Sequence, residues 1–244
     1  MLESTPISFY NVTLTYTHPG QNDLIKVWLG LPSAWNEKFQ GVGGGGWVTR
    51  SPSKMVPAIS QGYAAVSTDG GHDALGQTAD SWHFASVALD DMTLLGKQLA
   101  EAYYGKAISK SYWSGCSTGG RQGLTMAQRY PDAYDGILAT APAVNWAQFV
   151  PAIFWPQRMM QELSYFPPQC ELDAISAAAT RACDELDGLK DNIIGLPGLC
   201  TFDPRIVVGQ AYSCGNTTGA VSHSAAEIAA STWNGATSAE GDLQ

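Results

Sequence analysis

Alternating apolar and polar positions mark strands in the first part of the chain. Residues 24–31 (LIKVWLGL) alternate in this way and stop at Pro32, because proline has no N–H to donate to a strand ladder. Short apolar runs predict further strands that are buried within a sheet. These runs lie at 62–68 (GYAAVST), 111–114 (SYWS) and 136–141 (GILATA).

Segments between these runs have a helical period. Over residues 86–104 apolar side chains recur every three or four positions, and Gly105 follows as a stop signal. Residues 124–130 predict a second helix that closes at Pro131. Strands and helices therefore alternate, which predicts an α/β fold: a mostly parallel sheet with helices on both faces.

The pattern changes near Asn145, and Pro, Cys and acidic loop residues dominate after it. Strands are hard to find there, so we expect one domain over 1–145 and a second over 146–244. Of the 244 residues, 45% are hydrophobic and only 14% are charged. This composition provides enough apolar material for a packed core and too little charge for a disordered chain.

Charge and hydropathy argue against two kinds of partner. The chain has 13 Lys plus Arg and 22 Asp plus Glu, a net charge of −9. Nucleic acid is not expected as a partner, because its phosphates require a basic face. No apolar run approaches the roughly 18 residues that a membrane-spanning helix needs, so no membrane partner is expected. The first residues, MLESTPISFY, show no signal peptide.

The strongest chemical signal is the sequence GCSTG at 115–119, which matches G-x-S-x-G between a predicted strand and a predicted helix. In this context the motif is a nucleophile elbow, a sharp turn that presents the hydroxyl of Ser117 and the backbone N–H of Thr118. Gly43 to Gly46 also follow a strand, and a Gly-rich loop there can donate a second N–H to an oxyanion. The alternatives for this loop are a flexible turn or a phosphate-binding loop, but the P-loop pattern is missing.

A serine nucleophile needs a base, and no histidine is well placed in the sequence. In the α/β-hydrolase order the base follows the nucleophile, and only His223 follows Ser117. Its neighbours Ser222 and Ser224 resemble helix caps, so a surface histidine at a helix start is the favoured interpretation. His72 follows a strand and can face an active site, but it precedes the nucleophile.

Three segments resemble the tannase/feruloyl esterase family: 111–146, 35–47 (WNEKFQGVGGGGW) and 62–74 (GYAAVSTDGGHDA). The stretch 111–146 is specific, because a cysteine directly before the nucleophile is that family's variation on the elbow. The resemblance implies an α/β-hydrolase core with an inserted lid domain. It also implies a Ser-Asp-His triad that hydrolyses esters of hydroxylated aromatic acids. Ser117 is then the nucleophile, and Thr118 and Gly46 supply the oxyanion N–H groups.

The chain departs from the family pattern toward its end. The family's catalytic Asp and its His-Cys pair lie beyond the lid, whereas this sequence has no His-Cys dipeptide and stops at Gln244 in a segment that still resembles the lid. The beginning resembles a position after the family's signal peptide. We therefore expect a truncated chain with a sheet incomplete at its C-terminal side, nearly inactive alone. A second chain that completes the fold is a possible partner.

Five cysteines leave one without a partner within the chain. The resemblance makes Cys116 the unpaired one, since its family partner follows the missing His. It also pairs Cys183 with Cys200, and Cys170 and Cys214 can then form a second bridge.

The acidic segment 183–193 (CDELDGLKDNI) is a candidate calcium loop. Calcium prefers six to eight hard oxygen ligands, and Gly188 permits the sharp turn that would gather them. By composition alone an acidic, solvated turn is equally good. The family has a structural calcium site with this spacing of three carboxylates and two backbone carbonyls, which here would be Asp184, Asp187, Asp191, Leu189 and Ile193.

These features together predict a secreted serine carboxylesterase that acts on feruloyl or galloyl esters attached to plant cell-wall polysaccharide or tannin. Trp47, Trp82 and Trp146 are candidates to line an aryl-binding cleft. The sequons at Asn11 and Asn216 fit an extracellular glycoprotein. The alternative is a non-catalytic, calcium-stabilised α/β-hydrolase-like domain that acts by binding.

Overall fold

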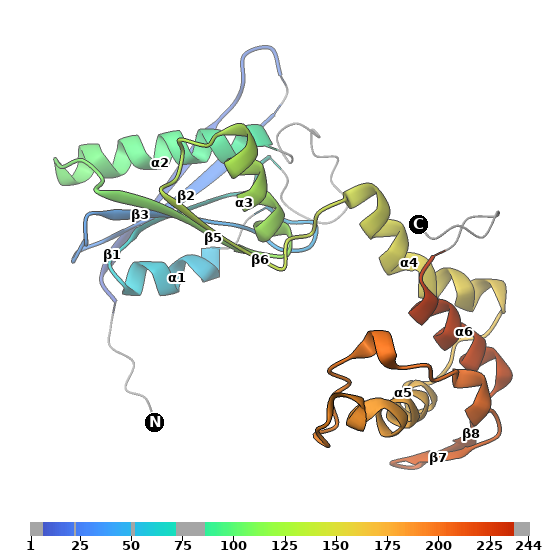
Figure 1. The fold of residues 1–244 in the computed structure, drawn as a ribbon. Coiled ribbons are helices and arrows are strands. Elements are labelled where there is room, and N and C mark those ends of the chain that lie inside the picture. Colours follow the sequence, from blue (N-terminus) through green and yellow to red (C-terminus); the bar gives the residue numbers. More distant parts are fainter. Residues whose placement is uncertain (1–6, 22, 50–51, 72–85, 237–244) are drawn as a thin grey trace. The chain divides into compact units, whose positions relative to one another are not determined.

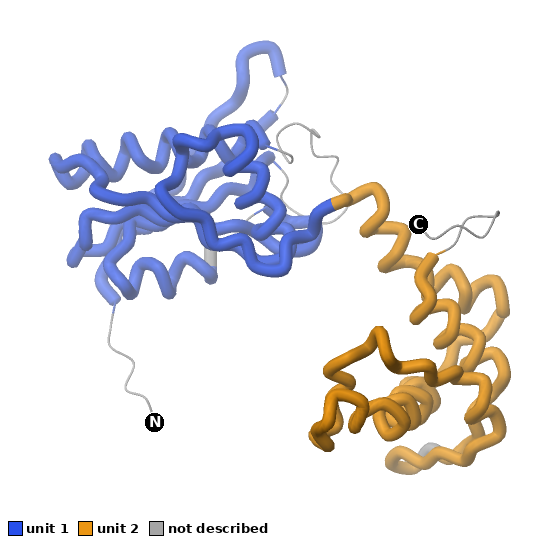
Figure 2. Tube along the Cα trace, in the orientation of Figure 1, with its two compact units in different colours: residues 1–144 blue, residues 145–244 orange. Residues whose placement is uncertain are grey.

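The computed structural model describes residues 7–21, 23–49, 52–71 and 86–236. The chain divides into two compact units, Met1–Val144 and Asn145–Gln244, adjacent to the boundary that the sequence suggested (Figure 2). Each unit has its own core and is described by itself. No helix in the described ranges is long and apolar enough to cross a membrane.

The first unit is built on a six-stranded sheet in the order β1-β2-β4-β3-β5-β6. The strands β4, β3, β5 and β6 run parallel to one another. The strand β2 pairs antiparallel with β1 and with β4. The predicted α/β fold with a mostly parallel sheet is therefore confirmed. The strands are β1 (Phe9–Tyr16), β2 (Ile25–Pro32), β3 (Lys38–Val42), β4 (Ala64–Thr68), β5 (Lys110–Cys116) and β6 (Gly136–Thr140).

Helices cover both faces of this sheet (Figure 1). On one face α2 (Ala88–Tyr104) and α3 (Thr118–Arg129) pack on a core centred on Phe39, Val66 and Trp113. On the other face α1 (Pro52–Ser60) packs on a smaller cluster that includes Val42 and Ala65. The successive β4 residues Ala65 and Val66 thus pack into the cores on opposite faces of the sheet, because neighbouring side chains of a strand point to opposite faces.

Several predicted elements agree with the observed ones, and others differ. The expected strands at 24–31, 62–68, 111–114 and 136–141 correspond to β2, β4, β5 and β6. The expected helix at 124–130 begins earlier, at Thr118. The prediction omitted its first turns because they contain Gly120 and Gly123, and glycine disfavours helices in general. Here it is required: a Cβ on Gly123 would lie 2.7 Å from the Trp113 ring.

The second unit is mainly helical and contains two disulfides. Its helices are α4 (Trp146–Glu162), α5 (Gln169–Cys183) and α6 (His223–Asn234), with short 3₁₀ turns η2 (Asp184–Asp187), η3 (Pro197–Leu199) and η4 (Pro204–Val207). One antiparallel hairpin joins β7 (Ala211–Cys214) to β8 (Thr217–Ala220). The disulfides are Cys170–Cys214 and Cys183–Cys200, and Cys116 in the first unit is free and exposed. That this unit forms part of a lid remains a prediction.

Candidate active site

Ser117 occupies the sharp turn between β5 and α3. Its backbone has φ 59° and ψ −117°, a conformation that non-glycine residues rarely adopt. Its N–H donates to the Thr140 carbonyl at 3.0 Å, and its own carbonyl accepts the N–H of Ala143 at 3.1 Å. These bonds to β6 and the residues after it hold the turn in place and leave Ser117 exposed. The backbone therefore has the geometry of a nucleophile elbow.

Glycine is required on both sides of this turn by close backbone approach. A Cβ on Gly115 would overlap the carbonyl group of Gly119. A Cβ on Gly119 would lie 3.0 Å from the carbonyl oxygen of Gly44, in the loop that follows β3. The G-x-S-x-G spacing is thus a packing requirement between three backbone segments, which explains why small residues flank the serine at these two positions.

The Gly-rich loop lies against the elbow and is bonded to it. The N–H of Gly119 donates to the carbonyl of Gly44 at 3.2 Å, and the Thr118 hydroxyl donates to the carbonyl of Gly46 at 2.6 Å. The structure therefore brings Ser117, Thr118 and Gly46 together, the three residues predicted to form the reactive site.

The same place is electrostatically suited to an anion. The N–H of Thr118 opens α3, a helix of 12 residues, and the first N–H groups of a helix have no partner within it. In the described part of the chain neither this N–H nor that of Gly46 donates to an acceptor. Arg121 lies in the same first turn, half-buried, and burial lowers its pKa without removing its charge at neutral pH. The helix dipole adds to this positive potential.

The sequence analysis did not identify Trp113, whose buried side chain holds the elbow by a hydrogen bond. Its ring is buried in the core, and its indole N–H donates to the Gly119 carbonyl at 2.9 Å. The sequence contained a signal for this role: a tryptophan in the strand directly before the serine. A buried indole N–H needs a hydrogen-bond acceptor, and the adjoining turn can supply one.

The structure describes two histidines, His18 in the first unit and His223 in the second. His223 begins α6 after the N-cap Ser222; its side chain is 74% exposed, and its Nε2 lies 3.7 Å from Glu227. His18 lies between the carboxylates of Asp23 and Asp91. The other candidates from the sequence, His72 and Trp82, lie outside the described residues.

The acidic loop after α5 curls around Asp184. This buried carboxylate accepts the N–H groups of Asp191 and Ile193 at 3.1 and 3.2 Å, while Asp187 accepts the N–H of Leu189 at 2.9 Å. All five predicted calcium ligands thus belong to one folded loop whose carboxylate and carbonyl oxygens suit the metal. The carboxylates of Asp184 and Asp191 meet at the N–H of Ile193, which both accept. Within the described ranges, however, no group of three His, Cys, Asp or Glu could hold a metal ion. Calcium therefore stays a prediction.

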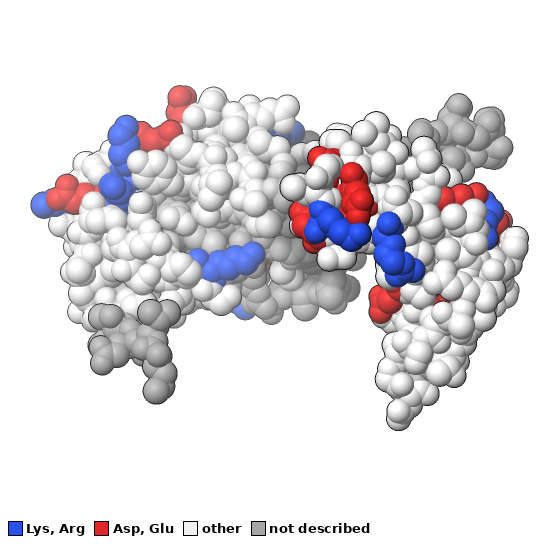
Figure 3. Space-filling view, turned by 60° about the horizontal axis from the view of Figure 1, so that its bottom comes forward, with Lys and Arg blue, Asp and Glu red and all other residues white. Residues whose placement is uncertain are grey.

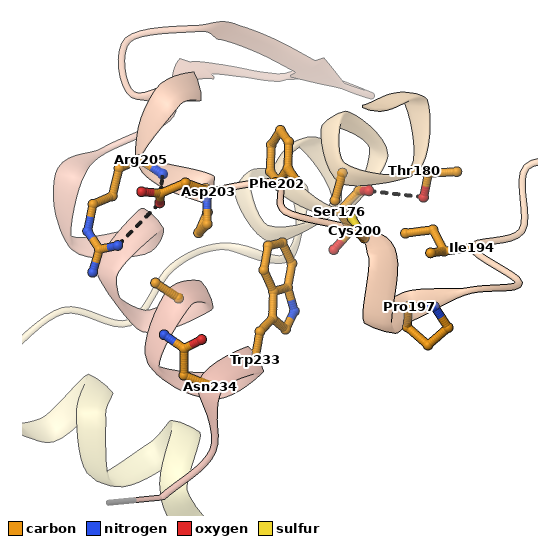
Figure 4. Close-up of a pocket in the computed structure, with 13 residues that line it drawn as sticks. Ser176, Thr180, Ile194, Pro197, Cys200, Phe202, Asp203, Arg205, Trp233 and Asn234 are labelled. Carbon is orange, nitrogen blue, oxygen red and sulfur yellow. Dashed lines mark hydrogen bonds and ion pairs between the residues drawn. The ribbon is translucent and has the colours of Figure 1, made fainter. Parts of the chain in front are cut away.

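The second unit contains a cavity of about 720 Å³ (Figure 4). The rings of Phe202 and Trp233, 6.2 Å apart, form one wall, and Asp203 and Arg205 are bonded to each other beside it. The cavity contains no nucleophile–base pair, so we assign it no chemical step.

The sheet order, the strained serine between β5 and α3, and the adjoining Gly-rich loop together define the α/β-hydrolase class. Comparison with known proteins gives the family. The family model for tannase and feruloyl esterase matches residues 11–241, and the chain belongs to this family.

Relatives of known name agree with this assignment. The chain is 39% identical over 249 residues to a protein named "Probable feruloyl esterase" from Arthroderma benhamiae, covering 95% of this chain and 46% of the relative. It is 33% identical over 235 residues to a tannase from Aspergillus oryzae, covering 88% of this chain and 40% of that protein. A solved tannin acyl hydrolase from Aspergillus niger superimposes with a TM-score of 0.79 at 31% identity, covering 91% of this chain and 46% of the other. The chain thus spans about half the length of the curated relatives it matches.

Proposed function

We propose that this chain carries the nucleophile and the oxyanion site of a carboxylic ester hydrolase. The observation that carries the proposal is the strained Ser117, held beside the N–H groups of Thr118 and Gly46. Family membership supports the same reaction, since the named relatives are feruloyl esterases and tannases.

The reaction proceeds through an acyl-enzyme. The Ser117 oxygen bonds to the ester carbonyl carbon while its proton passes to a general base, and the carbonyl oxygen becomes an oxyanion bound by the two N–H groups. Collapse of this intermediate breaks the bond to the alcohol, which leaves with the proton. Water then attacks the acyl-enzyme by the same route and releases the acid.

We propose that the base and its orienting carboxylate come from polypeptide outside these 244 residues, either a continuation or a second chain. The chain covers less than half of the length of its named relatives. The strand β6 is a second observation in favour of a sheet that continues beyond the described strands. This strand pairs with β5, and no described strand covers its other edge. Its Leu138 is 62% exposed, and β6 has no charge or proline that would protect a free edge.

The substrates we propose are esters of hydroxylated aromatic acids, feruloyl or galloyl, attached to cell-wall polysaccharide or tannin. The names of the relatives support this class. Trp47 directly follows Gly46 and is 48% exposed, so a large aromatic surface lies next to the proposed oxyanion site. Secretion and glycosylation are part of the proposal, and both sequon asparagines, Asn11 and Asn216, are exposed.

A second candidate is a non-catalytic domain, stabilised by calcium, that acts by binding. It is favoured by one observation: His18, the histidine that the structure describes in the first unit, is bonded to Asp23 and Asp91. The curled loop around Asp184 is compatible with both candidates.

The experiment that separates the candidates is hydrolysis of methyl ferulate and methyl gallate. We expect the 244-residue chain alone to be nearly inactive, and a protein of the relatives' full length to turn over ester. Replacing Ser117 by Ala in the longer protein should abolish turnover, because about a millionfold in kcat depends on the nucleophile in serine hydrolases. Full activity in the Ser117→Ala variant would refute the assignment, and activity in neither form would favour the binding domain.

A further inference from the structure

The Gly-rich loop needs an anchor if it is to bind an oxyanion. Four successive glycines, Gly43 to Gly46, have more backbone freedom than any other residues would have, and a free loop would have to reorganise when charge develops. We propose that the side chains of Thr118 and Gln122 are positioning residues that fix this loop in its anion-binding geometry. The inference rests on the proposed function and adds two side chains to it.

Gln122 holds the loop at Gly44. Its side chain is fully buried, and its Oε1 accepts the N–H of Gly44 at 3.0 Å. The carbonyl of Gly44 is held as well, because it accepts the N–H of Gly119 at 3.2 Å. Both peptide groups of this glycine are therefore bonded to α3, and neither can turn without leaving a buried polar group unpaired.

Thr118 holds the loop at Gly46, the residue proposed to donate the second N–H. The Thr118 hydroxyl is buried and donates to the carbonyl of Gly46 at 2.6 Å. On the other side of Gly46, the Gly45 carbonyl accepts the N–H of Val48 at 3.2 Å. The peptide between Gly45 and Gly46 is trans, so the N–H of Gly46 points away from Val48.

The two anchors belong to one rigid element. Thr118 and Gln122 are four residues apart on α3 and so lie on the same face of the helix. Thr118 contributes twice: its backbone N–H faces the oxyanion position, and its hydroxyl fixes the loop that donates the other N–H. Loop and elbow are thereby set at one separation before substrate binds, which is the condition for electrostatic stabilisation without reorganisation.

The test uses a benzylphosphonate anion, a non-covalent mimic of the tetrahedral oxyanion, with neutral methyl benzoate as the comparison ligand. Binding to the 244-residue chain is measured by NMR titration for the wild type, Thr118→Val, Thr118→Ser and Thr125→Val. Thr125 is the matched control, because its hydroxyl donates to the Arg121 carbonyl within α3 and does not reach the loop.

Thr118→Val should weaken phosphonate binding about tenfold, the value of one lost hydrogen bond, and leave binding of the neutral ester unchanged. Thr118→Ser should restore the wild-type affinity, and Thr125→Val should not change it. Equal phosphonate binding by Thr118→Val and wild type would overturn the positioning role. A wild type that binds no phosphonate would count instead against the proposed anion site.

Gln122→Met provides a second, independent measurement. It removes the acceptor of the Gly44 N–H and nearly preserves side-chain volume, so the amide exchange of Gly44 should become at least about tenfold faster. The N–H of Gly43 is the internal control, because it donates to the Ser114 carbonyl at 3.0 Å and should keep its protection. Unchanged exchange at Gly44 would show that Gln122 does not hold the loop.

Discussion

At the scale of single residues, the proposed chemistry depends on backbone geometry around Ser117. A non-glycine residue at φ 59° and ψ −117° costs on the order of 1–3 kcal/mol, which persists only where the surroundings enforce it. Here the enforcement comes from the hydrogen bonds of Ser117 to Thr140 and Ala143 and from the close packing of Gly115 on Gly119. Strain held by such contacts presents a hydroxyl in a fixed position.

Gly115→Ala should therefore destabilise the first unit by about 3 kcal/mol, because its new Cβ would overlap the Gly119 carbonyl group. Gly45→Ala is the matched control, since nothing lies within 4 Å of a Cβ there and the change should stay within about 0.5 kcal/mol. Urea unfolding of both variants measures the difference. Equal stabilities would show that the elbow is not tightly packed.

His18 should make stability depend on pH. Its Nδ1 lies 2.6 Å from Asp23 and its Nε2 lies 3.1 Å from Asp91, so only the protonated ring can donate to both carboxylates. The hydrogen bond to Asp23, with the nearby charge of Asp91, raises the pKa of His18 above its usual 6.5. The stabilisation is therefore fully present below about pH 6.5 and is lost as pH rises through the higher folded-state value.

The measurement is the melting temperature between about pH 5.5 and 8.5, the range in which a histidine with a raised pKa loses its proton. Wild type should lose stability toward the alkaline end of this range, and His18→Gln should show a flatter curve. Parallel curves for the two proteins would contradict a charged His18.

At the scale of elements, the sequence predicted the parts whose residues match their local preference. The strands β2, β4, β5 and β6, the helix α2 and the elbow were all visible as patterns. The helix α1 and the strand β1 are among the elements that were not predicted. The helix α1 contains Pro57, which disfavours a helix interior, and is stabilised by packing on β2 and β4. The strand β1 is an edge strand defined by its pairing with β2, which is a long-range property.

The site was predictable to a similar extent. Ser117, Thr118 and Gly46 follow from a motif and a resemblance, whereas Trp113 and Gln122 act through contacts that only the folded chain creates. A buried glutamine in a helix looks like an ordinary helix former in the sequence. Its partner, the N–H of Gly44, is 78 residues away.

The acidic loop after α5 makes a prediction at the same scale. If calcium binds there, EDTA should lower the melting temperature by roughly 2–4 °C for each kcal/mol of binding free energy. Asp184→Asn should remove this response, because Asp184 is the buried carboxylate around which the loop folds. Glu185→Gln is the control, since Glu185 is exposed and paired with Lys190. A melting curve unchanged by EDTA would count against the metal.

At the scale of the whole molecule, the surface combines small groups of charged side chains with exposed apolar residues. On the face drawn in Figure 3, acidic and basic side chains adjoin in small groups and large areas are uncharged. Apolar exposure includes β6, which is an edge strand among the described strands and whose Leu138 is 62% exposed. Such an edge favours pairing with another strand, which is why we propose a further polypeptide segment there.

Leu138→Lys should therefore reduce self-association of the 244-residue chain, measured by light scattering, because a charge on an edge strand disfavours pairing. In a longer, active protein the same substitution should lower stability, since the side chain would then be covered. Leu124→Lys is the control: Leu124 is 42% exposed, but on α3 rather than at the sheet edge. Identical behaviour of the two variants would contradict a pairing role for β6.

The central claim is that Ser117 is the nucleophile of an ester hydrolase. The most direct measurement is peptide mass spectrometry of the protein from its native source after treatment with a fluorophosphonate, which labels a serine only when a base activates it. We predict one phosphonylated residue, Ser117, with ester hydrolysis lost in proportion to labelling. Continued hydrolysis of methyl ferulate or methyl gallate with Ser117 unmodified would contradict the account.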